Sequence, residues 1–165
     1  MKVVSLLPSA TEIVACVGGL RYLVGRSHEC NFPEDVEKLP ALTAAKTPFV
    51  NSKQMNDAVV ETLASGSGLY TVDEDLLREL EPDVIVTQSV CAVCSVDYQL
   101  VQAIAQKLDR PPLIIDLNPQ SLEEVLEGCT TVGAALGLEE QAAKARHSLT
   151  DRVQKVEEFV KSSPL

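Results

Sequence analysis

Four short runs of apolar residues alternate with helical segments along the chain. They span residues 3–7, 22–25, 83–88 and 113–117. The first, third and fourth are each followed by a stretch whose apolar positions recur every three or four residues. A continuous apolar run of this length is typical of a buried parallel strand, because both of its faces are covered. Strands that alternate with helices in this way predict an α/β fold, here a Rossmann-like, doubly wound parallel sheet.

Capping boxes mark several of the predicted helix starts. Each pairs Ser or Thr with a Glu three residues later: Ser9 with Glu12, Thr71 with Glu74, and Ser121 with Glu124. The helices that follow are expected to end near Gly18, Pro82 and Gly137, and a further helix is predicted over residues 96–108. The pattern is weaker over residues 35–68, where it indicates a short strand at 39–43 and a helix at 56–63.

The last predicted helix, over residues 139–160, is the longest. Its small and apolar positions are Ala142, Ala145, Leu149, Val153, Val156 and Val160, and it would measure about 30 Å. We therefore divide the chain into a lobe at 1–137 and a long helix with its tail at 138–165. An isolated lobe would leave the apolar stripe of this helix exposed, so self-association into a homodimer through the helix is one expectation.

Composition and the absence of certain motifs argue against several classes of function. The 165 residues suit one domain, and 14 basic against 24 acidic side chains give a formal charge of -10 with no basic cluster, which argues against nucleic acid and anionic membranes as partners. The N-terminal apolar run is too short for a signal sequence or a membrane span, so we expect a cytoplasmic protein without direct membrane insertion. Nucleotide-binding, phosphoryl-transfer and hydrolase motifs are absent, which predicts that the protein is not an enzyme.

Cysteine and histidine follow two of the predicted strands. Cys91 and Cys94 form a CxxC pair after residues 83–88, and His28 and Cys30 follow residues 22–25. The carboxyl ends of parallel strands share one sheet edge, where ligands bind in open α/β sheets. Thiolate and imidazole are ligands that zinc favours, so these four residues are a candidate metal site. Two alternatives stay open: buried or unligated cysteines, and a redox-active dithiol at Cys91 and Cys94.

Other residues are expected at the same edge or in the core. Ser9 and Thr11 are candidate ligand donors, with helix capping as the alternative, and Gln88 ends the third predicted strand. Arg26 and Glu29 are expected to form an ion pair at the mouth of the site. Cys16 and Cys129 lie on apolar stretches and are interpreted as small core residues.

Three segments together resemble a known family. Residues 4–12 (VSLLPSATE), 24–27 (VGRS) and 77–85 (LRELEPDVI) resemble the N-terminal lobe of the helical-backbone, class III periplasmic-binding-protein-like family. The His28 to Cys30 segment and the CxxC pair are similar to its cobalamin-binding or cobalamin-transport-like branch. The resemblance implies two lobes joined by one long helix, with the ligand between them, and this chain matches the first lobe and that helix.

The resemblance also implies a function. It indicates a non-catalytic binding protein of the kind that serves ABC importers, with a corrinoid or another metal chelate as its small-molecule ligand. It places an aromatic wall at Tyr70, for which a lid over the core is the alternative. The candidate ligand-binding residues are then Ser9, Arg26, His28, Glu29, Tyr70 and Gln88, and the candidate cofactors are cobalamin or zinc. A lobe that has lost its ligand and serves as an interaction protein is the competing interpretation.

Overall fold

A computed structural model describes residues 1–47, 50–65, 68–89, 96 and 98–163. The chain forms two compact units, the first made of residues 1–12 and 22–118 and the second of residues 13–21 and 119–165. Helix α1 (Pro8–Cys16) contributes residues to both units. The predicted boundary between residues 137 and 138 separates the lobe from the long helix and its tail. These two units do not test that boundary, so it stays a prediction.

The first unit is built on a four-stranded parallel sheet. Its strand order is β2-β1-β5-β6, and its members are β1 (Val3–Ser5), β2 (Leu23–Gly25), β5 (Val84–Thr87) and β6 (Leu113–Asp116). All three pairings are parallel. Val3, Val4, Ile85 and Val86 have no exposed surface, which is the burial on both faces expected of a parallel sheet. The predicted fold class, a Rossmann-like α/β sheet followed by a long helix, is confirmed.

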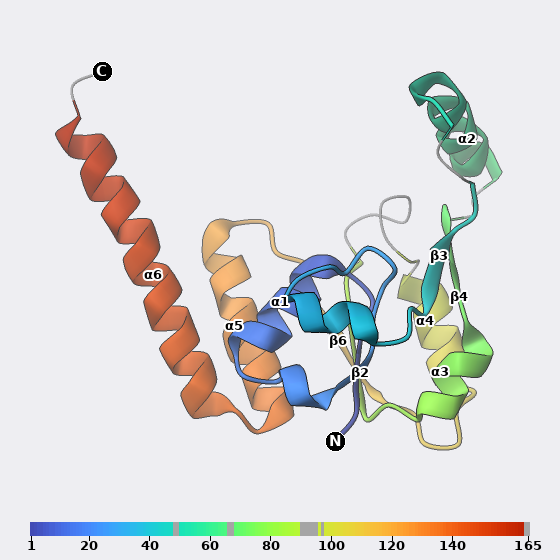
Figure 1. Ribbon diagram of the computed structural model, residues 1–165, viewed down its shortest axis with the longest axis horizontal. Coiled ribbons are helices and arrows are strands. Elements are labelled where there is room, and N and C mark those ends of the chain that lie inside the picture. Colours follow the sequence, from blue (N-terminus) through green and yellow to red (C-terminus); the bar gives the residue numbers. More distant parts are fainter. Residues whose placement is uncertain (48–49, 66–67, 90–95, 97, 164–165) are drawn as a thin grey trace. The chain divides into compact units, whose positions relative to one another are not determined.

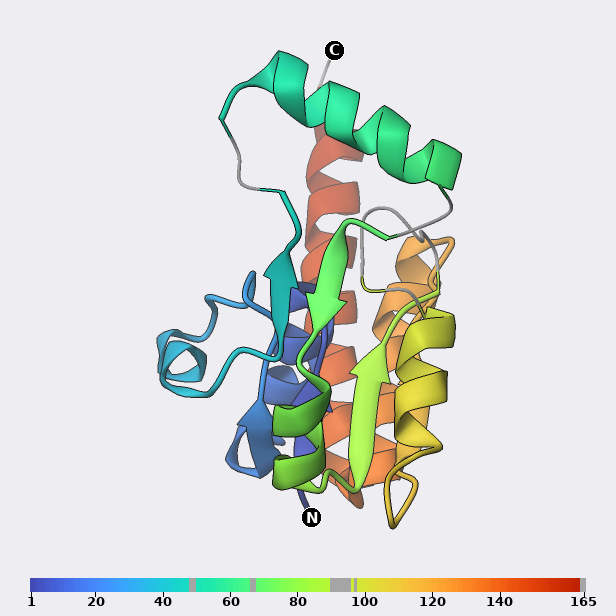
Figure 2. The same ribbon diagram turned by 90° about the vertical axis from the view of Figure 1, so that its right-hand side faces the viewer.

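Two helices cover one face of this sheet (Figure 2). They are α3 (Glu74–Leu80) and α4 (Tyr98–Ala105). Leu77 of α3 and Ile104 of α4 pack with Val4 and Ile85 of the sheet in one buried apolar cluster. The carboxylate of Asp73 accepts a hydrogen bond from the Leu76 N–H at 2.9 Å, so the residue that caps α3 is Asp73 and the predicted Thr71 cap is wrong.

A long excursion separates β2 from β5. It contains the 3-10 helix η2 (Glu34–Lys38), strand β3 (Thr43–Ala45), helix α2 (Ser52–Ser65) and strand β4 (Tyr70–Val72). A shorter 3-10 helix, η1 (Leu20–Tyr22), precedes β2. Strands β3 and β4 form an antiparallel ribbon in which Thr43 pairs with Val72 and Ala45 with Tyr70. The strand expected at 39–43 thus begins at Thr43, and β4 was not predicted, because three-residue strands carry almost no periodic signal.

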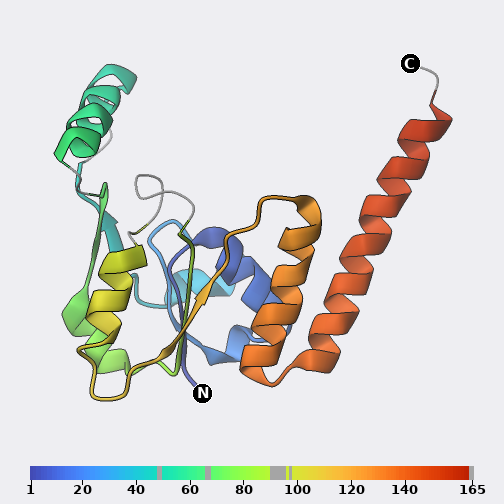
Figure 3. The same ribbon diagram turned by 180° about the vertical axis from the view of Figure 1, so that it is seen from behind.

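The second unit is dominated by two antiparallel helices, α5 (Leu122–Leu136) and α6 (Glu139–Ser162), which lie side by side in Figure 3. The Ser121 hydroxyl accepts from the Glu124 N–H at 3.2 Å, and Gly137 ends α5 with φ 65°, as the sequence predicts. A Cβ added at Gly133 would overlap the Cβ of Ala142, so this glycine permits the close approach of the two helices.

Two smaller expectations are wrong. Helix α1 begins at Pro8, so Ser9 lies inside its first turn and is not the capping residue. Cys129 is buried as expected, but Cys16 is exposed and is not a core residue. Within the described residues, no helix combines the length and the apolar character that a membrane span requires.

Candidate functional site

A hollow of about 300 Å³ lies where β1, β2 and β5 end. We call it the carboxyl-edge pocket. Its walls come from the turns after these three strands and from the β3–β4 ribbon, which lies beside them. The residues that line it are Leu6, Leu7, Pro8, Ser9, Ser27, His28, Glu29, Thr43, Tyr70, Gln88 and Val96. Of the six predicted ligand-binding residues, the pocket brings together Ser9, His28, Glu29, Tyr70 and Gln88.

His28 is held at the pocket by Thr43. The Thr43 hydroxyl oxygen lies 3.0 Å from the backbone nitrogen of His28 and 2.6 Å from its Nδ1. The same hydroxyl donates to the Ser27 Oγ at 3.1 Å. Thr43 and Ser27 are both almost fully buried, which makes this a fixed support for the imidazole ring.

This pattern of hydrogen bonds favours one tautomer of His28. A hydroxyl has one proton to donate, and that of Thr43 goes to Ser27. With that proton on Ser27, Thr43 accepts at its contact with Nδ1, which places the ring proton on Nδ1 and the lone pair on Nε2. A neutral imidazole with its lone pair on Nε2 is the form that ligates metals.

Nε2 of His28 is buried and has no hydrogen-bond partner in the part of the chain that the structure describes. The Glu29 Oε1 lies 3.2 Å from it but is not aligned for a hydrogen bond. A lone pair and a carboxylate oxygen repel each other at this distance unless a proton or metal ion lies between them. Two adjacent donors about 2.1 Å from one metal would be about 3.0–3.4 Å apart, so the observed spacing suits a shared cation.

Tyr70 forms the aromatic side of the pocket. It is the first residue of β4, and its ring centroid lies 5.5 Å from that of His28 at an interplanar angle of 50°. Its place on the ribbon puts the ring among the pocket residues that follow β1, β2 and β5. An aromatic face beside an imidazole offers a surface for a flat ligand.

Arg26 is bonded to the backbone of its own loop. Its guanidinium donates to the backbone carbonyls of Ser27 at 3.0 Å, Leu39 at 3.2 Å, and His28 and Glu37 at 3.3 Å. The prediction of an ion pair between Arg26 and Glu29 is wrong. The guanidinium of Arg26 is hydrogen-bonded to these carbonyls, and the carboxylate of Glu29 lies beside His28. Arg26 therefore fixes the loop after β2 and is not among the residues that line the pocket.

Cys30 faces the interior. It is 1% exposed, and its Sγ lies 3.0 Å from the Oγ1 of Thr11, which in turn donates to the Ser5 Oγ at 2.8 Å. Thr11 is fully buried and so is not available to a ligand in the pocket. Cys91 and Cys94 lie outside the described residues, within which no cluster of three or more metal-ligating side chains occurs. The four-residue metal site of His28, Cys30, Cys91 and Cys94 stays a prediction.

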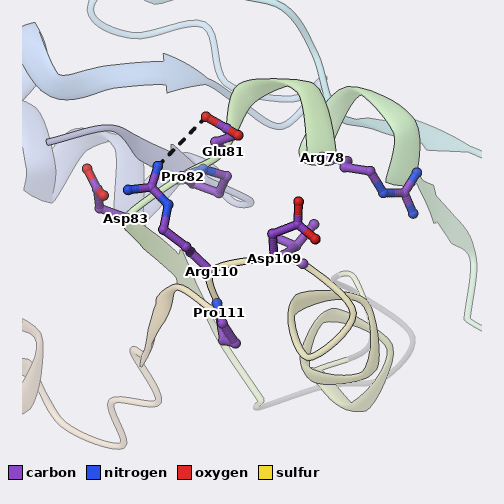
Figure 4. A pocket seen from close by; sticks show the side chains of 8 residues that line it. Arg78, Glu81, Pro82, Asp83, Asp109, Arg110 and Pro111 are labelled. Atoms are coloured by element: carbon purple, nitrogen blue, oxygen red, sulfur yellow. Dashed lines mark ion pairs between the residues drawn. The ribbon is translucent and has the colours of Figure 1, made fainter.

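A second hollow, of about 140 Å³, lies at the amino ends of β5 and β6 (Figure 4). Three of its charged groups have partners: an Arg110 Nη2 lies 3.7 Å from a Glu81 Oε2, and Asp83 accepts from the Lys2 N–H at 2.7 Å. That backbone hydrogen bond is the main cause that holds the pKa of Asp83 below its ordinary value. The carboxyl-edge pocket is the better candidate site, because it holds the buried, unpartnered Nε2 of His28.

Sequence reasoning missed Ser27 and Thr43 as parts of the site. Both belong to residue types that are common in loops, and Thr43 lies within the weakly patterned segment 35–68. Their role depends on the β3–β4 ribbon, which carries Thr43 to the loop after β2. No local signal in the sequence indicates that contact.

No family model and no curated protein matches the chain. Solved structures do match. The periplasmic vitamin B12-binding protein of Vibrio cholerae aligns at 19% identity and a TM-score of 0.70 over 98% of this chain and 51% of its own. A periplasmic heme-binding protein from Pseudomonas aeruginosa aligns at 15% identity and a TM-score of 0.71, over 98% of this chain and 47% of its own. A possible iron-binding, periplasmic solute-binding protein from Staphylococcus epidermidis aligns at 19% identity and a TM-score of 0.70, over 99% of this chain and 52% of its own.

The chain thus spans about half the length of the solved structures that it matches. That coverage agrees with one lobe of a two-lobed protein, as the sequence resemblance predicts. At this level of identity the likeness concerns the fold. The chain has the fold of one lobe of the class III periplasmic binding proteins.

Proposed function

We propose that the chain is a non-catalytic binding lobe whose small-molecule ligand is a metal chelate, with a corrinoid as the first candidate. The carboxyl-edge pocket receives one face of the chelate, and the Nε2 of His28 binds its metal. The observation that carries the proposal is the geometry of His28: the ring is fixed by Thr43, and its Nε2 is buried without a hydrogen-bond partner beside Tyr70. The names of the structural neighbours, which include B12-binding and heme-binding proteins, support the same class of ligand.

A chelate fits this site better than a bare metal ion. Among the described residues of the pocket, His28 and Glu29 are the two side chains that offer nitrogen or carboxylate donors of the usual metal-ligating kind. A structural zinc site takes four protein ligands, whereas a chelated metal brings most of its donors with it and needs one from the protein. The side chain of Glu29 is 64% exposed, so it can rotate away from Nε2 as the metal arrives.

The size of the pocket agrees with partial enclosure. Its volume of about 300 Å³ is at the low end for small-molecule sites, so a macrocycle would lie across the mouth of the pocket and contact it with one face. Tyr70 would then contact the ring system while His28 reaches the metal.

The test is a spectral titration of the 165-residue chain with aquocobalamin and, separately, with haemin. Binding through His28 replaces a labile axial ligand by imidazole, so the visible absorption spectrum should change with saturation. The His28→Ala variant should lose this change. His147→Ala is the matched control, because His147 is the second of two histidines in the chain and lies exposed on α6.

Each result has a defined meaning. A change in the spectrum with cobalamin that His28→Ala abolishes would establish a corrinoid site, and the same result with haemin alone would move the proposal to a haem. If neither compound changes its spectrum or releases heat on mixing, the proposal is rejected. Binding that His28→Ala leaves intact would also reject His28 as the metal ligand.

A further inference from the structure

The second unit carries an apolar groove of about 760 Å³ between α5 and α6. Its floor is aliphatic and its rim is charged. The residues that line it are Leu122, Val125 and Leu126 of α5 and Leu149, Arg152, Val153, Lys155, Val156 and Glu157 of α6. Leu122 and Val156 are 55% and 62% exposed. A groove of this kind, with an apolar floor and charged rims, is typical of a surface that another protein element covers.

The apolar surface continues along α6 beyond the groove. Helix α6 has 24 residues and α5 has 15, which correspond to about 36 Å and about 22 Å of helix. The last turns of α6 therefore extend past the start of α5, as Figure 3 shows. They carry Phe159 and Val160, which are 70% and 54% exposed.

We infer that the groove and the end of α6 bind the same surface of a second copy of this chain, with the two α6 helices antiparallel. In an antiparallel pair, residues at the same height have numbers with a constant sum. A two-fold axis midway between Val153 and Val156 sets Val153 against the partner's Val156. It also sets Leu149 against the partner's Val160, so apolar positions meet apolar positions at both of these levels.

The charges at the rim favour this register. The same axis places Arg152 at the height of the partner's Glu157, and the symmetry makes this contact twice. Within the described residues Arg152 has no ion pair, whereas Glu157 has a long one to Lys161 at 4.0 Å. A parallel pair would instead bring Arg152 against the partner's Arg152, so the electrostatics select the antiparallel arrangement.

The register also gives Phe159 a place to bind. Phe159 falls at the height of the partner's Thr150, and across the partner's α5–α6 hairpin that height corresponds to the partner's Val125. Val125 lines the groove. The most exposed aromatic side chain of the helix would therefore enter the partner's groove, where large apolar side chains act as anchors of an interface.

The test is the oligomeric state of the 165-residue chain, measured by sedimentation velocity and by light scattering across a concentration series. The chain should form a dimer at micromolar concentrations. Arg152→Glu and Glu157→Arg each set like charges against each other and should weaken the dimer about tenfold. The double variant Arg152→Glu/Glu157→Arg restores opposite charges across the axis and should recover most of the affinity.

The matched control is Glu158→Arg. It makes the same change of charge as Glu157→Arg, but Glu158 lies nine residues from Leu149, or about two and a half helical turns, and so is on the opposite side of α6. It should leave the dimer unchanged. A monomer at all concentrations would overturn the inference. A dimer that the single reversals do not weaken, or that the double variant does not recover, would overturn this register as well.

Discussion

The hydroxyl of Thr43 is the most informative single group to remove, because it supports His28 without contacting the proposed ligand's metal. Thr43→Val deletes an oxygen that takes part in three hydrogen bonds, to the backbone nitrogen and Nδ1 of His28 and to Ser27, and leaves the shape of the side chain nearly unchanged. At about 1 kcal/mol for each hydrogen bond, the free energy of unfolding should fall by about 2–3 kcal/mol.

A chain of this length loses about 2–4 °C of melting temperature per kcal/mol, so Thr43→Val should lower it by about 5–10 °C. The functional effect should be larger than a general loss of stability would explain. With Nδ1 unsupported, the ring is no longer restricted to the tautomer that leaves the lone pair on Nε2. Removal of such a supporting group typically weakens metal binding about 10–100-fold, and we expect that loss in the chelate titration.

Three measurements test this reasoning: thermal unfolding by circular dichroism, the nitrogen chemical shifts of the His28 ring, and the chelate titration. Thr43→Ser keeps the hydroxyl and should keep the tautomer. Thr71→Val makes the same substitution at an exposed position of β4, where the hydroxyl donates only to the Ala44 carbonyl at 3.4 Å, and should cost under about 0.5 kcal/mol. A Thr43→Val protein whose Nδ1 remains protonated and whose chelate affinity is unchanged would refute the assignment of Thr43.

Three further predictions concern the second unit. Gly133→Ala should lower the free energy of unfolding by about 1–2 kcal/mol despite the better helix propensity of alanine, because the new Cβ overlaps that of Ala142. Gly133→Ala/Ala142→Gly should restore stability in thermal unfolding, and additive losses would contradict the close contact. Cys16 is exposed, whereas burial is the main cause that raises the pKa of the Cys129 thiol, with Cys16 as a smaller one. A thiol reagent at neutral pH should therefore modify Cys16 first, as followed by peptide mass spectrometry, and equal rates would be inconsistent with this. The raised pKa of Cys129 favours the neutral thiol in the folded state. The contribution of Cys129 to stability is therefore present below the ordinary thiol pKa and is lost as pH rises through the raised value. Cys129→Ala should reduce this loss of stability at alkaline pH.

The sequence predicted the sheet because its strands are continuous apolar runs bounded by proline or glycine. It predicted α5 because Ser121 and Gly137 act locally, at the two ends of one helix. It did not predict β4, whose three residues pair with β3 across the whole of α2. It also assigned the α3 cap to Thr71, since Thr71 and Asp73 both offer a side-chain oxygen near the helix start, and only the conformation of the chain selects Asp73. Local signals were thus sufficient where one element decides the outcome, and insufficient where pairing between distant segments does.

The loop after β2 shows the same division within the site. Its residues alternate between holding the loop and facing the pocket: Arg26 binds backbone carbonyls, His28 and Glu29 line the pocket, and Cys30 turns inward to Thr11. Residue chemistry indicated that this loop matters, but it could not distinguish a support from a ligand. The support is what makes the one unpartnered nitrogen of the pocket useful, because a neutral imidazole binds a metal through one nitrogen while the other keeps the proton. In the proposed site, the carbonyls around Arg26 and the hydroxyl of Thr43 therefore determine the affinity of His28 as much as His28 itself does.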